Sequence, residues 1–282
     1  MDLAKQIKHP EIQTSDSVVS EVIHLPNDHL EKSITNVLEP LGGLKNYISK
    51  NDKVMLKPNF NTGDPFPAST DPNFLLAIIQ LILALTPNIQ IIESSTLRVN
   101  TKQVIKDIMG DKIQNIPLVT EEDFDFITID LKSRGAKYLK SVKLPNTIHD
   151  PEAKIILLPC LKTHFIAHYT GALKLAVGFM ERKQRLKMHI SRRVPEKVAE
   201  LNLAYKPDLI IMDARKIFVT KGPANGRVES PQKILAAIGS NRTAIDIKGI
   251  SIIQSFPAEN KLKNTDVLNV RTIKRALELG ID

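Results

Sequence analysis

The segment LPCLKTHFIAHYTGALKLAVG, residues 158–178, places residues that can do chemistry directly behind an apolar run. His164 can exchange a proton near neutral pH, and the charge of a neighbouring Lys162 lowers its pKa. Lys174 adds a cation one turn beyond Thr170, which we expect to cap a helix. Because the free N–H groups at a helix start attract anions, the segment predicts a carboxylate or phosphate site.

Gly171, at the expected helix start, would let a ligand approach the backbone closely. No GxxxxGK[ST] phosphate-binding loop occurs in the chain, so the segment resembles such a loop only in its logic. A capped helix with solvated lysines is the structural alternative. Cys160 fits a small buried apolar residue better than a nucleophile.

Three histidines raise the question of a metal site. His164 and His168 would share a face if they lay on a helix, and His189 could then be a third ligand. We expect a loop over 164–168, where a spacing of four has no such meaning. We therefore predict no metal site and assign His189 to substrate binding, while the cofactor is left open.

Other candidates follow apolar runs elsewhere in the chain. Lys57 and Asn59 come at the end of KVMLK, where Pro58 forces the chain out of the strand and a long loop follows. Asp213 ends DLIIMD, and Asp246 follows Asn241 and Arg242. We expect Lys57 and Asn59 to bind the ligand. Each aspartate could orient a lysine, bind a cation or ligand hydroxyl, or cap a turn.

Apolar runs of strand length alternate with segments of helical period, which indicates an α/β protein with a mostly parallel sheet flanked by helices. We expect one domain over 1–282, with a possible subdivision near 145–155, and a short antiparallel excursion near 125–145. The expected strands are 18–25, 53–57, 88–93, 115–119, 154–159, 208–213 and 234–239, and the expected helices are 28–43, 73–85, 95–109, 194–205, 242–254 and 265–279.

Polar residues follow five of these strands. Since ligands bind outside the carboxyl ends of parallel strands, the five groups predict one shared cleft. The groups are KPN (57–59), ESS (93–95), PCLKTH (159–164), DAR (213–215) and GSNR (239–242).

The composition narrows the partners. The formal net charge of +8 suits an anionic ligand, and residues 181–206 hold eight Lys and Arg against three Glu. That basic rim is either a solvated helix face or the edge of an anion site. Aromatic residues make up only 5% of the chain and there is no tryptophan, so nucleic acid is not expected to be the main ligand.

A single cysteine allows neither an intrachain disulfide nor an iron–sulfur cluster held by this chain. The amino-terminal MDLAKQIKHPEIQ lacks the apolar core of a signal peptide. The longest apolar stretch, 74–85, is too short to span a membrane. We expect a cytoplasmic protein without a membrane partner.

The order of KPN, TDP, KTH, TGALK, DLIIMDA, GPANG and a late Asp resembles domain-of-unknown-function family 362, from about Lys53 to Ser251. Leu175 departs from the Asn that the family usually has there, and the cysteine segments for iron–sulfur clusters that many relatives carry are absent. The residues matching the family pattern are Lys57, Asn59, Thr70, Asp71, Lys162, Thr163, His164, Thr170, Gly171, Lys174, Gly178, His189, Asp213, Gly222, Gly226 and Asp246.

Two functional hypotheses follow. In the first, the chain is an enzyme acting on a small anionic metabolite, with His164 moving a proton, Lys162 and Lys174 holding the anion, and Asp213 orienting a lysine or binding a cation. In the second, it is a non-catalytic module for a redox partner or a metal-loaded cofactor, bound through the basic rim and the histidines.

Overall fold

In a computed structural model, which describes residues 19–96 and 99–281, ten strands form one sheet. Parts of three sequence predictions lie outside these residues: the stretch 1–13, the first residue of the strand expected over 18–25, and positions 97–98 of the helix expected over 95–109. Asp282 also lies outside them.

The central part of the sheet is parallel, which confirms an α/β fold. β10, β7, β2, β3 and β4 are neighbours running in one direction, while β12 lies antiparallel between β10 and β1. In sheet order, the strands are β1 (Ser20–Ile23), β12 (Lys233–Ile238), β10 (Leu209–Phe218), β7 (Ala153–Leu157), β2 (Lys53–Lys57), β3 (Ile89–Glu93) and β4 (Leu118–Thr120). β11 (Val228–Glu229) pairs with the end of β10.

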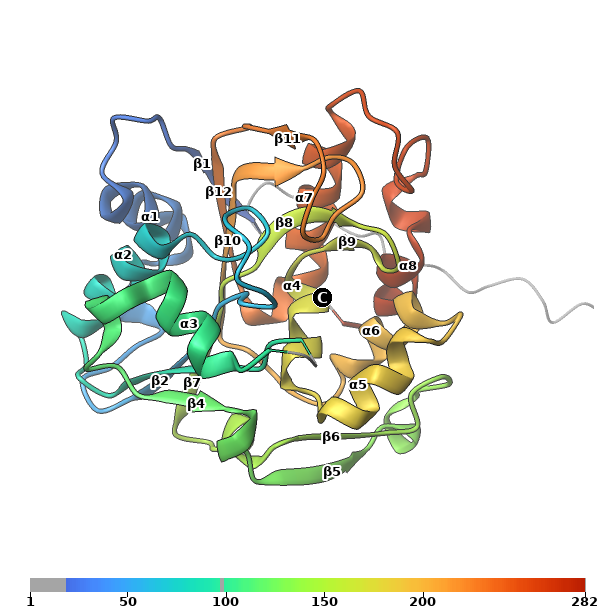
Figure 1. Ribbon diagram of the computed structural model, residues 1–282, viewed down its shortest axis with the longest axis horizontal. Coiled ribbons are helices and arrows are strands. Elements are labelled where there is room, and N and C mark those ends of the chain that lie inside the picture. The colour runs from blue at the N-terminus through green and yellow to red at the C-terminus, as the bar shows by residue number, and fades with distance from the viewer. Residues whose placement is uncertain (1–18, 97–98, 282) are drawn as a thin grey trace, which may run out of the picture.

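Helices cover both faces of the sheet (Figure 1), and a separate apolar core lies under each layer. One layer holds α1 (Leu30–Leu38), α2 (Pro72–Leu83) and α3 (Thr101–Met109). The other holds α4 (Ala172–Leu175), α6 (Val194–Leu201), α7 (Arg242–Gln254) and α8 (Arg271–Glu278), with α5 (Arg182–His189) beside α6. No helix of residues 19–96 and 99–281 has the length and apolarity to cross a lipid bilayer.

Two local predictions are confirmed. β5 (Phe126–Asp130) and β6 (Ser141–Pro145) form the expected antiparallel pair, seen at the bottom of Figure 1. α2 begins with Asp71 as its N-cap, whose side chain accepts a hydrogen bond from the Phe74 N–H at 2.9 Å, and Pro72 occupies the first turn.

The expectation of five polar groups at one edge of the sheet is wrong for two of them. β12 runs against β10, with Ile238 opposite Leu209, so the GSNR segment lies at the other edge. β10 continues to Phe218, which places Asp213 within the strand instead of at its end. KPN and ESS do follow parallel neighbours, β2 and β3.

The loop expected around residues 160–170 is a β-hairpin. β8 (Cys160–His164) pairs antiparallel with β9 (His168–Thr170) and continues alongside β10, where Asp213 is opposite Cys160. Pro159, which has no N–H to donate, separates β8 from β7. Because side chains alternate along a strand, Lys162 and His164 lie on the same face of the hairpin.

Candidate functional site

A cavity of about 90 Å³ lies where β2, β3, β8, α4 and α5 converge. It brings together residues that are far apart in the sequence, and most of the predicted binding residues line it. These are Lys57, Asn59, Lys162, His164, Thr170, Lys174 and His189, to which the structure adds Glu93, Ser94, Gly178, Arg185 and Pro223 among others.

Lys57 forms a buried ion pair with Glu93. The Lys57 Nζ lies 2.5 Å from Glu93 Oε1, and both side chains are at most 2% exposed. Glu93 also accepts hydrogen bonds from the N–H groups of Phe60 and Ser94, each at 2.8 Å. Gly178 makes room for this pair, because a Cβ there would lie 2.8 Å from the Lys57 Cε. The single carboxylate among the lining residues is thus already neutralised.

Lys162 reaches from β8 into the loop after β2. Its ammonium donates to the carbonyls of Pro67, at 3.1 Å, and Ala68. No carboxylate forms an ion pair with it within the described ranges, and burial lowers its pKa to about 8. The loop itself is held by two bonds between Asn59 and Thr70, of 2.8 and 3.0 Å.

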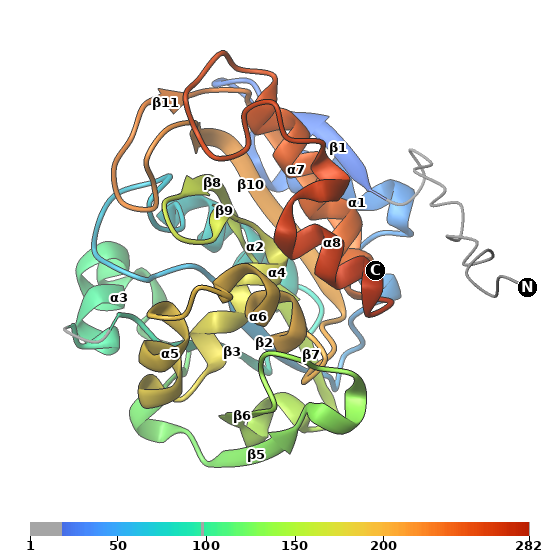
Figure 2. The ribbon, with the colours of Figure 1, turned by 90° about the vertical axis from the view of Figure 1, so that its right-hand side faces the viewer.

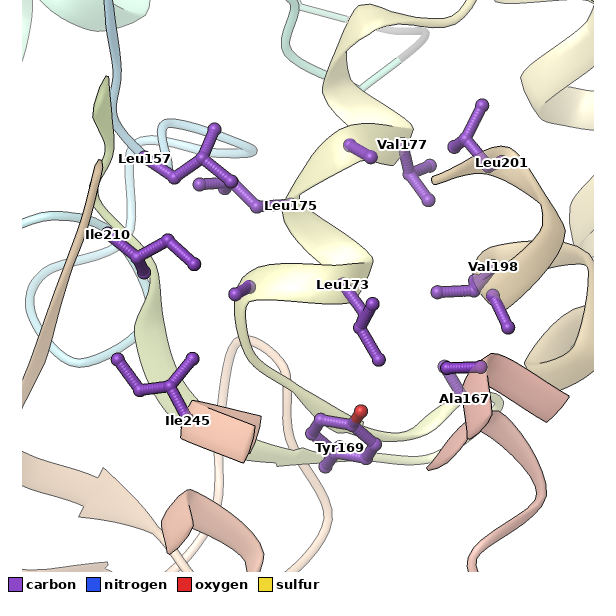
Figure 3. Packing of buried hydrophobic residues seen from close by; sticks show 14 of the residues in the cluster. Leu157, Ala167, Tyr169, Leu173, Leu175, Val177, Val198, Leu201, Ile210 and Ile245 are labelled. Carbon is purple, nitrogen blue, oxygen red and sulfur yellow. The ribbon is translucent and has the colours of Figure 1, made fainter. Parts of the chain in front are cut away.

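Lys174 has neither a hydrogen bond nor an ion pair to any residue within 19–96 or 99–281. Burial, followed by the nearby charges of Lys162 and Arg185, lowers its pKa to about 7. The side chain is fixed in place by its helix: α4 lies between the β8–β9 hairpin and α6 (Figure 2). Its neighbours Leu173 and Leu175 are buried in the apolar core (Figure 3).

Arg185 enters the cavity from α5 as a further buried cation. Its guanidinium donates to the carbonyls of Ser94, at 2.9 Å, and Ser95, at 2.6 Å, and lies 3.6 Å from Glu121. Sequence reasoning missed Arg185, because nothing separates it from the other basic residues of the 181–206 rim. Glu93 was also missed as a site residue, although its place at the end of an apolar strand parallel to β2 was a usable signal.

The ring of His164 is held in one tautomer. Its Nδ1 faces the N–H groups of Ile166, at 3.1 Å, and Ala167, at 3.2 Å, and can only accept from them. The proton of the neutral ring is therefore on Nε2. Burial and the charge of Lys174 lower the pKa of His164 well below its usual value. This arrangement suits a fixed hydrogen-bond donor and argues against the proton-carrying role predicted for His164.

His189 has the opposite arrangement. Its Nδ1 lies 2.7 Å from the Arg185 carbonyl, which can only accept, so the proton is on Nδ1 and Nε2 carries the lone pair. Burial lowers the pKa of His189. The cavity therefore contains one imidazole donor and one imidazole acceptor.

Two further polar atoms of the cavity wall lack partners in the described part of the chain. These are the Asn59 amide nitrogen and the Thr170 hydroxyl oxygen, both buried. Buried polar groups are usually hydrogen-bonded, so unpaired ones facing a cavity indicate that a polar ligand completes them.

The predicted anion site at the helix start is wrong. The N–H groups of Ala172 and Leu173 donate to the Asp246 carboxylate, at 2.6 and 3.0 Å, and the Tyr169 hydroxyl donates to it at 2.9 Å. A Cβ on Gly171 would meet Asp246 Oδ1 at 2.3 Å, so the glycine serves this contact.

Asp246 and Gly171 therefore hold the start of α4, and neither lines the cavity. Thr170 ends β9 and does not cap the helix, since the N-cap position falls to Gly171.

Asp213 also lies outside the cavity wall. Its carboxylate binds the Arg215 guanidinium through Oδ1, at 3.0 Å, and Oδ2, at 2.7 Å. Arg215 in turn stacks over the rings of Phe66 and Phe74. Asp213 thus fixes an arginine, and the predicted contact with a lysine or a cation of the site is not formed.

No three His, Cys, Asp or Glu side chains of residues 19–96 and 99–281 meet in a way that could hold a metal ion. His168 begins β9 and does not join His164 and His189 at the cavity. Cys160 is fully buried, and burial raises its pKa to about 11, which fits a small core residue.

The chain belongs to the family described as Domain of unknown function (DUF362), whose sequence pattern matches residues 54–251. It is 26% identical over 252 residues to "Thylakoid-associated protein sll1697" from Synechocystis sp. (strain ATCC 27184 / PCC 6803 / Kazusa), covering 80% of this chain and 70% of that protein.

A crystal structure of a Thermotoga maritima protein aligns with a TM-score of 0.44 and 12% identity, over 92% of this chain and 60% of that one. The chain thus spans about three fifths of the length of that protein.

Changing Asp246→Ala leaves two helix N–H groups and the Tyr169 hydroxyl without an acceptor. We expect the free energy of unfolding to fall by about 2–4 kcal/mol, measured by urea denaturation. Asp266→Ala, which removes an exposed cap of the Leu268 N–H, should cost less than about 1 kcal/mol. An Asp246→Ala protein of normal stability that no longer binds anions would contradict the structural role.

We expect His164 to remain neutral and protonated on Nε2 between about pH 5 and 8. Its pKa is lowered, so the uncharged form dominates throughout this range. Nitrogen-15 NMR of the imidazoles, assigned by comparison with His164→Gln, measures both the tautomer and the titration. A titration midpoint inside the range, or a proton on Nδ1, would show that the ring is free to exchange protons.

Proposed function

We propose that the chain is an enzyme that binds a small carboxylate or phosphate in this cavity and uses Lys174 to move a proton. The observation that carries the proposal is the imbalance of charge: Lys57, Lys162, Lys174 and Arg185 line the cavity with one carboxylate, and Lys57 already neutralises it. An oxyanion would supply the missing negative charge and acceptor atoms.

The individual groups have distinct roles in this proposal. Lys162 and Arg185, fixed by main-chain carbonyls, set the position of the anion. The Asn59 amide and the His164 Nε2–H donate to its oxygens, and the His189 Nε2 accepts from a ligand hydroxyl. Lys174, with a pKa of about 7, is the group that can both gain and lose a proton near neutral pH.

The alternative of a docking module for a redox protein has less support. Part of the 181–206 rim is used within the chain, since Arg182 pairs with Glu121, Arg193 pairs with Glu196, and Arg185 is buried. Fewer charges are then left to face a partner. The same loss applies to nucleic acid, which the scarcity of aromatic residues already disfavours.

We further propose a cytoplasmic location, supported by the single, buried cysteine. The name of the Synechocystis relative places that protein at thylakoids. Association with the surface of a membrane is accordingly the alternative to a freely diffusing enzyme.

Replacing Lys174→Met should weaken binding of methyl phosphate by at least about tenfold at pH 6.5, as measured by calorimetry, because a charged hydrogen bond is lost. In the unchanged protein, affinity should fall as the pH rises through 7 and 8, where Lys174 and then Lys162 lose their protons. The matched control is Lys187→Met, an exposed lysine of α5.

Equal losses in both lysine variants would mean that the anion binds to the general basic surface. Absence of any methyl phosphate binding in the unchanged protein would exclude an oxyanion site.

A further inference from the structure

A second pocket, of about 230 Å³, adjoins the cavity. The two are continuous, because they share five lining residues: Asn61, His164, Arg185, His189 and Pro223. A ligand held in the cavity can therefore extend into the second pocket without crossing a wall of protein.

The walls that belong to the second pocket alone are mostly apolar. Phe165, Ile166 and Leu186 line it, from the β8–β9 turn and from α5. Phe165 is 58% exposed and Leu186 is 49% exposed, which is unusual for side chains of this size. Two large apolar groups left open in one pocket indicate a binding surface, whereas single exposed ones need no explanation. We call these three residues the apolar shelf.

The shelf is continuous with the polar cavity through stacked rings. The rings of His164 and Phe165 lie 5.2 Å apart at an angle of 7°. His164 is fixed through its Nδ1, and the Phe165 carbonyl accepts a hydrogen bond from the Lys261 ammonium at 2.5 Å. The aromatic face is thus held in position before any ligand binds, which lowers the entropic cost of binding there.

We propose that the ligand is an anion bearing a flat apolar group, such as an aryl phosphate or aryl carboxylate, with its charged end in the cavity and its ring on the apolar shelf. This inference rests on the proposed oxyanion site, since that site orients the ligand. The smaller cavity has room for the charged end, and the larger pocket has the shape and the chemistry for the remainder.

The test compares phenyl phosphate with methyl phosphate, two monoesters that differ in the group placed on the shelf. Calorimetry should give a dissociation constant for phenyl phosphate about tenfold lower, as expected for an aromatic group leaving water. Phe165→Ala and Leu186→Ser should each reduce that ratio by about threefold or more while leaving methyl phosphate binding unchanged. Leu83→Ser is the matched control, because Leu83 is 45% exposed at the end of α2 and lines neither pocket.

The outcomes separate this inference from the oxyanion site. If both esters bind equally, or if the preference for phenyl phosphate survives both shelf variants, the apolar shelf is not part of the ligand site, and the oxyanion site stands. If neither ester binds, both proposals fail. A preference also lost in Leu83→Ser would show a general effect of the substitutions and would overturn the shelf.

Discussion

The buried pair of Lys57 and Glu93 is the interaction on which the site depends. It joins the ends of two parallel neighbours, β2 and β3, with both charges out of contact with water. A buried charge is tolerated only when it is paired, so neither partner can be removed without leaving the other unpaired. Because Glu93 is committed to Lys57, nothing on the cavity wall is left to neutralise Lys162 and Lys174.

That shortage of negative charge accounts for the state of the other groups. Burial and mutual repulsion bring the pKa of Lys174 to about 7 and that of Lys162 to about 8. The same positive field keeps His164 neutral. An anion entering the cavity would reverse these shifts, so binding and protonation are coupled. The acidic residues that might have neutralised the lysines are bound elsewhere: Asp213 to Arg215, and Asp246 to the start of α4.

The sequence was sufficient to predict the α/β class, the antiparallel pair at 125–145 and most of the basic residues of the site, because long apolar runs and strand-end lysines are local signals. It did not show that β12 runs antiparallel or that β8 and β9 form a hairpin, since strand direction depends on pairing between distant segments. The role of Asp246 was not predictable either, because its partners lie more than seventy positions earlier in the chain. Arg185 looked like one basic residue among eight, and only the fold selects it.

Proton uptake on anion binding tests the central claim most directly. Sulfate is the suitable probe, because it does not itself titrate near neutral pH. Calorimetric titration at pH 8, in two buffers of different ionisation enthalpy, measures the protons taken up for each sulfate bound. The account predicts a net uptake that is reduced in Lys174→Met. Sulfate binding with no uptake, or with release of protons, would contradict it.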